Sequence, residues 1–519
     1  MSELVHSSDP GTTCDGQVWG KGAAEKTYQA NGFDPAKTDH SPSFTPGRVA
    51  KTVFNTYRSN GDLTVSGFLT DFSAYDSRLG SYAGDTNVDH SVGGRGIDAA
   101  RLAASGGAFD EVVVSFAGII GDQGEKRDFI NRAAIDFKIA SSESDLPNQR
   151  GAVTFIDAWG DVLAYLNLGF NRFVSDDAAD MFDPAKAQGL LGAVNRLHHD
   201  NPDLKVGLTV GGWTMSQAFH HITKEPQSRA RFTQSLQRIF RAFPMFTTLH
   251  LDWEWPGSQG AEGNDFGPED AGNYATLIRE TKAALPDATI AVAIPAEPDR
   301  LRAMNVPALL ESGAGRLDLM AYDLFASPSS PALGHQAGLY GNPDDPNTLS
   351  IDKAVTYLLA EAQVPSRTIH LSYTTYSRNA RQATVSSASP LRGTYNPGPD
   401  GATVGSFESG VSDYADILRN YLDLERQSGR NGFTLYTDTT ADADYLYNPD
   451  SQVYMSLDTP RSVRAKAEYA RTKGLGGLFA WTADTDTGLL ANAAREGLGH
   501  TLANEVVDMK PFYINGTNQ

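Results

Sequence analysis

Cysteine is almost absent from the sequence: among 519 residues, only Cys14 carries a thiol. An intrachain disulfide is therefore excluded, as are zinc sites that need two or four cysteine ligands. The sequence also lacks an uninterrupted apolar run of about 18 residues, which a membrane-spanning helix requires. Residues 1–13 have neither the charged nor the apolar region of a secretory signal peptide. The protein is thus expected to remain inside the cell, to leave it by another route, or to be a mature chain.

Positive charge is scarce relative to negative charge. The sequence has 43 lysine and arginine residues against 63 aspartate and glutamate residues, which gives a net charge of −20. This balance argues against a nucleic-acid-binding protein, which needs a basic face to displace counterions. A hydrophobic content of 40% is ordinary for a soluble globular protein. The chain is long enough for roughly three domains or for one large barrel with additions.

Short apolar segments recur from residue 63 onward, and helical patterns lie between most of them. Eight segments are rich in apolar side chains, namely 63–69, 112–117, 206–210, 249–253, 289–295, 317–322, 369–373 and 477–481. Such runs are typical of a parallel sheet that is buried on both faces. Apolar residues at three- and four-residue spacing predict helices at 185–197, 229–240, 272–285 and 351–360. The alternation predicts an α/β fold, specifically a (β/α)8 TIM barrel.

The barrel accounts for only part of the chain, so the sequence predicts additions to it. Residues 1–60 are expected to form an irregular N-terminal extension, 61–375 the first part of the barrel, and 476–519 its last strand and helix plus a tail. Residues 376–475, with a helix at 462–473, predict a small α+β domain inserted between strands 7 and 8. A second insertion is expected at about residues 120–180. A doubly wound sheet is the alternative, but residues 70–73 lack its usual Gly-rich turn.

The predicted fourth strand ends with three ionisable side chains, His250, Asp252 and Glu254. Reacting groups of a barrel lie at the C-terminal ends of its strands, and the alternation along a strand points these three inward together. Because two neighbouring carboxylates repel, one of Asp252 and Glu254 is expected to stay protonated near neutral pH and to serve as a general acid. The alternative is an exposed loop, which the flanking Trp253 and Trp255 disfavour.

Three other strand ends carry residue types that suit a binding site, although each also has an ordinary explanation. Gly212, before Trp213, permits close approach to the backbone or merely makes a tight turn. Tyr322 and Asp323 offer a donor and an acceptor, or Asp323 caps the next helix. Trp481 provides a stacking surface for a sugar ring or fills the core.

Together these motifs give the chain a resemblance to the family 18 glycoside hydrolases, the chitinase family, from about residue 63 to about residue 500. The family signature D-G-x-D-x-D-x-E falls on Thr247 to Glu254, and S-x-G-G falls on Thr209 to Gly212. M-x-Y-D falls on Met320 to Asp323, and G-G-x-x-x-W falls on Gly476 to Trp481. No single motif is decisive, but their order and spacing are specific.

The resemblance implies substrate-assisted hydrolysis with retention, in which the acetamido group of an N-acetylglucosamine unit attacks its own anomeric carbon. It implies that Glu254 acts as acid and then base, that Asp252 orients the acetamido group, and that Tyr322 hydrogen-bonds its oxygen. It also implies substrate-binding roles for a further set: Trp481, Asp323, Met320, Trp213, Gly212, Tyr376 and Arg378. The implied substrate is chitin or chito-oligosaccharides, and no cofactor is expected. No metal is expected either, because the adjacent histidines at 198–199 and 220–221 lack a ligand spacing.

The sequence departs from the family at the first inward aspartate of the signature, which is His250 here. The serine and tyrosine that support this aspartate in several relatives correspond to Thr209 and Phe68. We hypothesise that His250 and Thr209 belong to a changed support network, in which His250 donates a hydrogen bond to Asp252 and holds it ionised. The alternative is a core histidine with satisfied hydrogen bonds and no such role.

Two other functions on the same fold stay open. A chitin-binding lectin is one, although lectins of this kind typically lack the catalytic glutamate that is present here as Glu254. An endo-β-N-acetylglucosaminidase is the other, although relatives with that activity tend to lack the inserted domain. The first 60 residues loosely resemble those of chitinases carried within bacterial insecticidal toxin complexes, so subunits of such a complex are expected partners. An extracellular location is expected, reached by non-classical export or by release from an assembly.

Overall fold

The computed structural model describes residues 53–58, 60–74, 102–103, 105–165, 168–398, 405, 409–424 and 426–518. Most of the predicted N-terminal extension, residues 1–60, therefore lies outside the described residues. Within the described ranges, no helix has both the length and the apolar character needed to cross a membrane.

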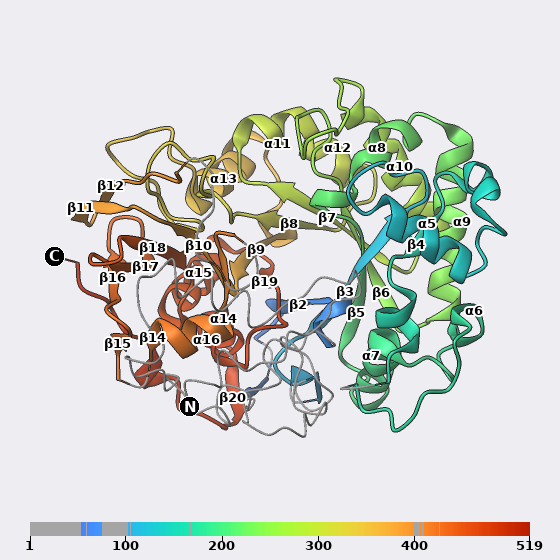
Figure 1. Cartoon of the computed structure of the whole chain (residues 1–519). Coiled ribbons are helices and arrows are strands. Elements are labelled where there is room, and N and C mark those ends of the chain that lie inside the picture. The colour runs from blue at the N-terminus through green and yellow to red at the C-terminus, as the bar shows by residue number, and fades with distance from the viewer. Residues whose placement is uncertain are drawn as a thin grey trace.

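Eight parallel strands close into a barrel in the described part of the chain (Figure 1). Their order around the barrel is β2-β19-β9-β8-β7-β6-β5-β3, and β3 pairs again with β2. The strands are β2 (Thr64–Thr70), β3 (Glu111–Ile119), β5 (Lys205–Gly211), β6 (Phe246–Asp252), β7 (Thr289–Pro295), β8 (Arg316–Met320), β9 (Ile369–Thr374) and β19 (Gly477–Trp481). Each strand coincides with one predicted apolar segment, and most of their apolar side chains are buried. The predicted (β/α)8 barrel is confirmed.

Helices cover the outside of the barrel, where the 3.6-residue apolar pattern places their buried faces against the strands. The helices that correspond to predicted ones are α7 (Gly189–Asp200), α9 (Pro226–Ala242), α10 (Asp270–Ala284), α13 (Ile351–Thr356) and α15 (Pro460–Lys473). The others are α5 (Arg127–Asp136), α6 (Ala178–Met181), α8 (Gln217–Ile222), α11 (Pro298–Met304), α12 (Val306–Glu311), α14 (Tyr414–Asn420) and α16 (Leu489–Gly497). Helix α15 has well-defined ends: Thr459 and Ser462 form a capping box, and Gly474 follows the last turn with a φ of 68°.

The predicted addition at about residues 120–180 packs on the second barrel strand. It contains α5, α6 and a short strand, β4 (Val153–Phe155), which pairs antiparallel with the end of β3. Helix α5 contacts β4, and Figure 1 places both on the side of the barrel opposite to the C-terminal segment.

The chain between β9 and β19 forms a five-stranded antiparallel sheet of order β13-β10-β18-β17-β16. Its strands are β10 (Tyr376–Ala380), β13 (Val411–Asp413), β16 (Thr434–Asp438), β17 (Ala443–Asn448) and β18 (Val453–Leu457). Shorter pairs accompany it: β11 (Thr384–Ala388) with β12 (Leu391–Thr394), and β14 (Leu422–Asp423) with β15 (Ser428–Gly429).

Outside this segment, β1 (Thr56–Arg58) pairs with β20 (Thr501–Asn504). The inserted α+β unit thus lies between the seventh and eighth barrel strands, while α15 packs on β9 and β19. The exact domain boundaries remain a prediction.

A single residue, Thr375, separates barrel strand β9 from insertion strand β10. Its N–H donates to the carbonyl of Trp481 at 3.2 Å, and its hydroxyl donates to the carbonyl of Thr482 at 2.5 Å. Its own carbonyl accepts from the N–H of Tyr414 at 2.9 Å and from the hydroxyl of Thr485 at 2.9 Å. Thr375 is therefore hydrogen-bonded both to the barrel and to the inserted unit.

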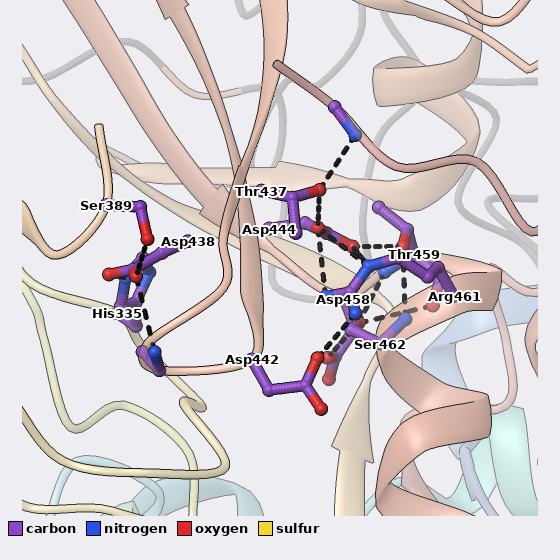
Figure 2. Close-up of polar contacts among 12 residues, drawn as sticks. His335, Ser389, Thr437, Asp438, Asp442, Asp444, Asp458, Thr459, Arg461 and Ser462 are labelled. Atoms are coloured by element: carbon purple, nitrogen blue, oxygen red, sulfur yellow. Dashed lines mark hydrogen bonds and ion pairs between the residues drawn. The ribbon is translucent and has the colours of Figure 1, made fainter. Parts of the chain in front are cut away.

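Two aspartates of β16 and β17 organise the polar contacts of the inserted sheet (Figure 2). Asp444 accepts from the hydroxyl of Thr437 at 2.7 Å and from Nε of Arg461 at 3.0 Å, so it links the sheet to the first turn of α15. Asp438 is hydrogen-bonded to Nε2 of His335 at 2.9 Å, and His335 lies in the chain between β8 and α13. Burial raises the pKa of Asp438, but His335 and other donors outweigh it and bring the pKa to about 2.

Candidate active site

The backbone around Asp252 and Glu254 is held by two polar side chains. Asp252 is the last residue of β6, and Glu254 follows two residues later. The hydroxyl of Ser216 donates to the carbonyl of Asp252 at 3.2 Å and accepts from the N–H of Glu254 at 3.0 Å. The side-chain amide of Asn264 donates to the carbonyl of Glu254 at 2.9 Å. The backbone that carries both carboxyl groups is therefore held at the C-terminal mouth of the barrel.

The two glycines at the end of β5 allow this arrangement. Gly211 and Gly212 have φ values of 107° and 104°, which side chains disfavour. A Cβ on Gly211 would lie 2.3 Å from the carbonyl oxygen of Asp252. The N–H of Gly212 donates to that same oxygen at 2.8 Å. The backbone of Gly212 thus lies close to the backbone of β6. The sequence had indicated that glycine at this position permits such a close approach.

Burial and nearby negative charges raise the pKa of both carboxyl groups. Burial raises the pKa of Asp252 to about 7, the charge of Asp318 adds to the rise, and His250 opposes it. Burial also raises the pKa of Glu254 well above its usual value, and the charges of Asp252 and Asp323 add to it. Oδ1 of Asp252 is buried and has no hydrogen-bond partner among the described residues. Glu254 is thus suited to donate a proton near neutral pH.

An aromatic floor lies beside the carboxyl groups. Met320, Tyr322 and Trp481 pack against Phe68 and Phe479, so the ends of β8 and β19 meet the end of β2. The rings of Phe68 and Trp481 are 5.9 Å apart between centroids. Burial raises the pKa of Tyr322 well above its usual value, so its phenol remains a hydrogen-bond donor. The predicted grouping of Tyr322, Met320 and Trp481 is present in the structure.

Asp323 connects the barrel to the inserted sheet. It has a φ of 56°, and its carboxylate accepts from the hydroxyl of Tyr376 at 2.8 Å. Nε of Arg378 donates to the same carboxylate at 2.7 Å. The rings of Tyr376 and Tyr322 meet edge to face at 6.5 Å. The inserted sheet therefore contributes two of the predicted site residues, Tyr376 and Arg378, to the wall beside Tyr322.

Trp213 stands apart from this group: its side chain is 50% exposed, directly after Gly212. Among the described residues, no aromatic partner of Trp213 is found, so its ring is open to solvent. Exposure of this kind fits a surface on which a ligand stacks. Its predicted role remains a prediction.

The expected hydrogen bond from His250 to Asp252 is not formed, and this part of the hypothesis is wrong. Nδ1 of His250 is hydrogen-bonded to Asp318 at 2.8 Å, and Nε2 lies 3.6 Å from Glu111. Thr209 pairs beside His250 in the β5–β6 register, and its hydroxyl accepts from Ser115 at 3.4 Å. The imidazole turns across the barrel because acidic groups of β3 and β8 face both of its nitrogens.

A cluster of His220, Glu269 and Asp270 has the composition of a metal site. Nδ1 of His220 is hydrogen-bonded to Asp270 at 2.7 Å. Nζ of Lys224, however, lies 2.7 Å from Nε2 of His220 and 2.7 Å from Glu269. The ammonium group already supplies the positive charge here, so the cluster is an ion-pair network. Asp270 also accepts from the N–H groups of Gly257 at 3.1 Å and Gly267 at 2.8 Å.

Replacing Asp270 by alanine is expected to destabilise the fold by about 3 kcal/mol, because several buried donors lose their acceptor. Activity is expected to fall as well, since Asp270 ties down both ends of the loop that follows Glu254. Thermal unfolding and initial rates measure the two effects. Asp265→Ala is the matched control, because Asp265 is exposed on the same loop and, within the described ranges, forms an ion pair only with His221. Equal melting temperatures for the two variants would show that Asp270 is not the anchor.

Sequence reasoning missed the groups that support the site. Phe116 packs against Trp481 at 5.5 Å, and nothing in the sequence set it apart from other core phenylalanines. The charged residues Glu111, Arg316 and Asp318 did offer a signal. Asp318 interrupts the apolar run of β8, while Glu111 and Arg316 are the first residues of β3 and β8, and a charge within a buried strand needs a partner.

Comparison with known proteins agrees with this geometry. The family described as "Glycosyl hydrolases family 18" matches residues 90–486. Chitinase 1 of Yersinia entomophaga is 40% identical over 528 aligned residues, which cover 100% of this chain and 96% of that protein. Chitinase 2 of the same organism is 34% identical and covers 91% of this chain and 77% of its own length.

Solved structures give the same result. The crystal structure of the chitinase Chi1, fitted into the structure of the Yersinia entomophaga toxin complex, has a TM-score of 0.85 and 40% identity, covering 98% of this chain and 99% of its own. Chitinase ChiA74 from Bacillus thuringiensis has a TM-score of 0.67 at 23% identity, covers 86% of this chain and 71% of its own, and supports the fold alone.

Proposed function

Because this chain belongs to glycosyl hydrolases family 18 and is a glycoside hydrolase of the chitinase type, we propose that it cleaves β-1,4-linked N-acetylglucosamine polymers with retention of configuration. The observation that carries the proposal is the pair Asp252 and Glu254, whose raised pKa values leave a proton available at the mouth of a barrel. The phenol of Tyr322 and the indole of Trp481 lie on the adjacent aromatic floor.

In the proposed mechanism, Glu254 protonates the oxygen of the leaving sugar while the acetamido oxygen of the bound sugar attacks the anomeric carbon. Asp252 faces the acetamido N–H, and its carboxylate stabilises the positive charge of the resulting ring. Tyr322 stays protonated and donates to the acetamido group. Glu254, now a carboxylate, removes a proton from water. The water attacks the anomeric carbon on the face from which the leaving sugar departed, and this attack opens the acetamido ring with retention.

The test is the release of a fluorophore from chitobiose and chitotriose conjugates, with cellobiose conjugates as matched controls. Cellobiose lacks the acetamido group, so only the chito-conjugates should be turned over. NMR of the first product should show the β-anomer. Comparable turnover of cellobiose conjugates would exclude acetamido participation. Binding to chitin beads without turnover would instead favour the lectin.

We further propose that the protein acts outside the cell, with the subunits of a toxin complex as its partners. Support comes from the similarity to Yersinia entomophaga Chitinase 1 along the full chain and from the structural match to Chi1. Native size-exclusion chromatography of source material tests this partner. Elution only at the mass of the free chain would count against an assembled subunit.

A further inference from the structure

Four charged side chains form a closed ring inside the barrel, below Asp252. They are Glu111 of β3, His250 of β6, and Arg316 and Asp318 of β8, and each is at most 7% exposed. Arg316 donates to Glu111 and to Asp318, at 2.6 Å in both contacts. Asp318 is hydrogen-bonded to Nδ1 of His250 at 2.8 Å, and Glu111 lies 3.6 Å from Nε2 of His250.

The geometry of this ring favours a proton on both nitrogens of His250. Carboxylates only accept hydrogen bonds, and a neutral imidazole has one nitrogen that also only accepts. Here both nitrogens face carboxylate oxygens, from Asp318 and from Glu111. Charge balance leads to the same result. Two carboxylates and one guanidinium leave one negative charge uncompensated in the core, and an imidazolium neutralises it.

The strands around His250 are shaped to hold its ring. Gly207 of β5 faces it, and a Cβ there would lie 2.8 Å from Nε2. Ala291 of β7 is its register partner on the other side. The ring of Phe68 meets the imidazole edge to face at 5.2 Å. Small neighbours in β5 and β7 make room for the imidazole, and the ring of Phe68 packs against it.

We propose that Glu111 and Asp318 are positioning residues that hold His250 as an imidazolium, and that this buried cation is the counter-charge that allows Asp252 to ionise during catalysis. The second half of this statement rests on the proposed function. His250 precedes Asp252 by two residues, so both side chains lie on the inner face of β6. The cation acts on Asp252 through space, because His250 makes no hydrogen bond to it in the structure.

The other titratable group near this ring behaves differently and provides an internal comparison. His370 of β9 is buried near Arg316, and burial and that charge lower its pKa to about 3. Its Nε2 is hydrogen-bonded to the hydroxyl of Thr64 at 3.0 Å. For His250, burial lowers the pKa, but the carboxylates of Asp318 and Glu111 outweigh it and leave the pKa above its usual value. The two buried histidines of the barrel therefore have pKa values shifted in opposite directions.

The first experiment reads the charge directly and does not depend on activity. The protein is labelled with 15N in the histidine rings, and His250→Gln and His370→Gln assign the two signals. At pH 7 we expect both nitrogens of His250 to be protonated and His370 to show one unprotonated nitrogen. Asp318→Asn should convert His250 to a neutral ring. One unprotonated nitrogen on His250 in the native protein would overturn the inference.

The second experiment tests the link to Asp252 with pH profiles of kcat and kcat/KM on a chitobiose conjugate. The imidazolium lowers the pKa of Asp252, so its loss in His250→Gln raises that pKa. The rising limb of the pH profile should then shift to higher pH by about one unit, while KM stays unchanged. His370→Gln is the matched control with an unshifted limb. A charged His250 with superimposable profiles would refute the counter-charge role, while loss of all turnover in the native protein would refute the proposed function instead.

Discussion

Glu254→Gln is expected to lower kcat by about 10³-fold, the loss that follows removal of a general acid and base. The amide has nearly the shape of the carboxyl group but cannot give a proton to the leaving oxygen or take one from water. The backbone N–H of Glu254 and its carbonyl keep their bonds to Ser216 and Asn264, because these contacts do not involve the side chain. The fold and the binding of chito-oligosaccharides should therefore persist.

The measurement is fluorophore release from chitotriose conjugates, together with calorimetric titration of chitotriose into the variant. Glu262→Gln is the matched control, because Glu262 is an exposed acid on the loop that follows Glu254. Its rate should equal that of the native chain. A Glu254→Gln variant with native turnover would remove Glu254 from the mechanism, whereas equal losses in both variants would indicate general damage to the loop.

Asp252→Asn is expected to lower kcat by about 10²-fold, because the amide cannot balance the positive charge that forms on the acetamido ring. The same change should move the falling limb of the pH profile to lower pH. The charge of Asp252 contributes to the raised pKa of Glu254, so its removal lowers that pKa. Since Glu254 must be protonated to act as the acid, activity then disappears at a lower pH.

Profiles of kcat/KM between pH 4 and pH 9 measure this shift. Asp299→Asn is the matched control, because Asp299 is exposed on α11 and its ion-pair partner in the described part of the chain is Arg302. Neither the rate of this variant nor the positions of the two limbs of its pH profile should change. A falling limb that stays in place in Asp252→Asn would mean that the two carboxyl groups do not interact during catalysis.

The barrel could be predicted because local composition alone determines which segments become its strands. The segments 289–295 and 477–481 coincide with β7 and β19 to the residue, since each is a short and largely apolar run. Helix ends were harder. The predicted helix at 351–360 ends its regular α-helical part at Thr356 and continues as a wider π-helical turn to Glu361. The apolar pattern does not distinguish these two windings.

The candidate site was predictable where it follows a strand end and less so where it crosses the barrel. Alternation along β6 correctly indicated that His250 and Asp252 point to the interior. It could not indicate which partner His250 meets, because Asp318 lies 68 positions away in sequence. That pairing depends on the closure of the barrel and on the depth of each side chain in it, which no local pattern encodes.

The joint at Thr375 has a consequence for how this enzyme can be altered. Thr375 is the single residue between the barrel strand and the insertion strand, and its N–H, carbonyl and hydroxyl groups all form hydrogen bonds. Tyr376, the next residue along, already bonds to Asp323 beside the aromatic floor. Recombining the insertion with another barrel would therefore transplant part of the wall beside Tyr322 as well. Exchanging the insertion at residue 375 should alter substrate preference. A flexible spacer inserted there should separate that wall from the carboxyl groups of Asp252 and Glu254.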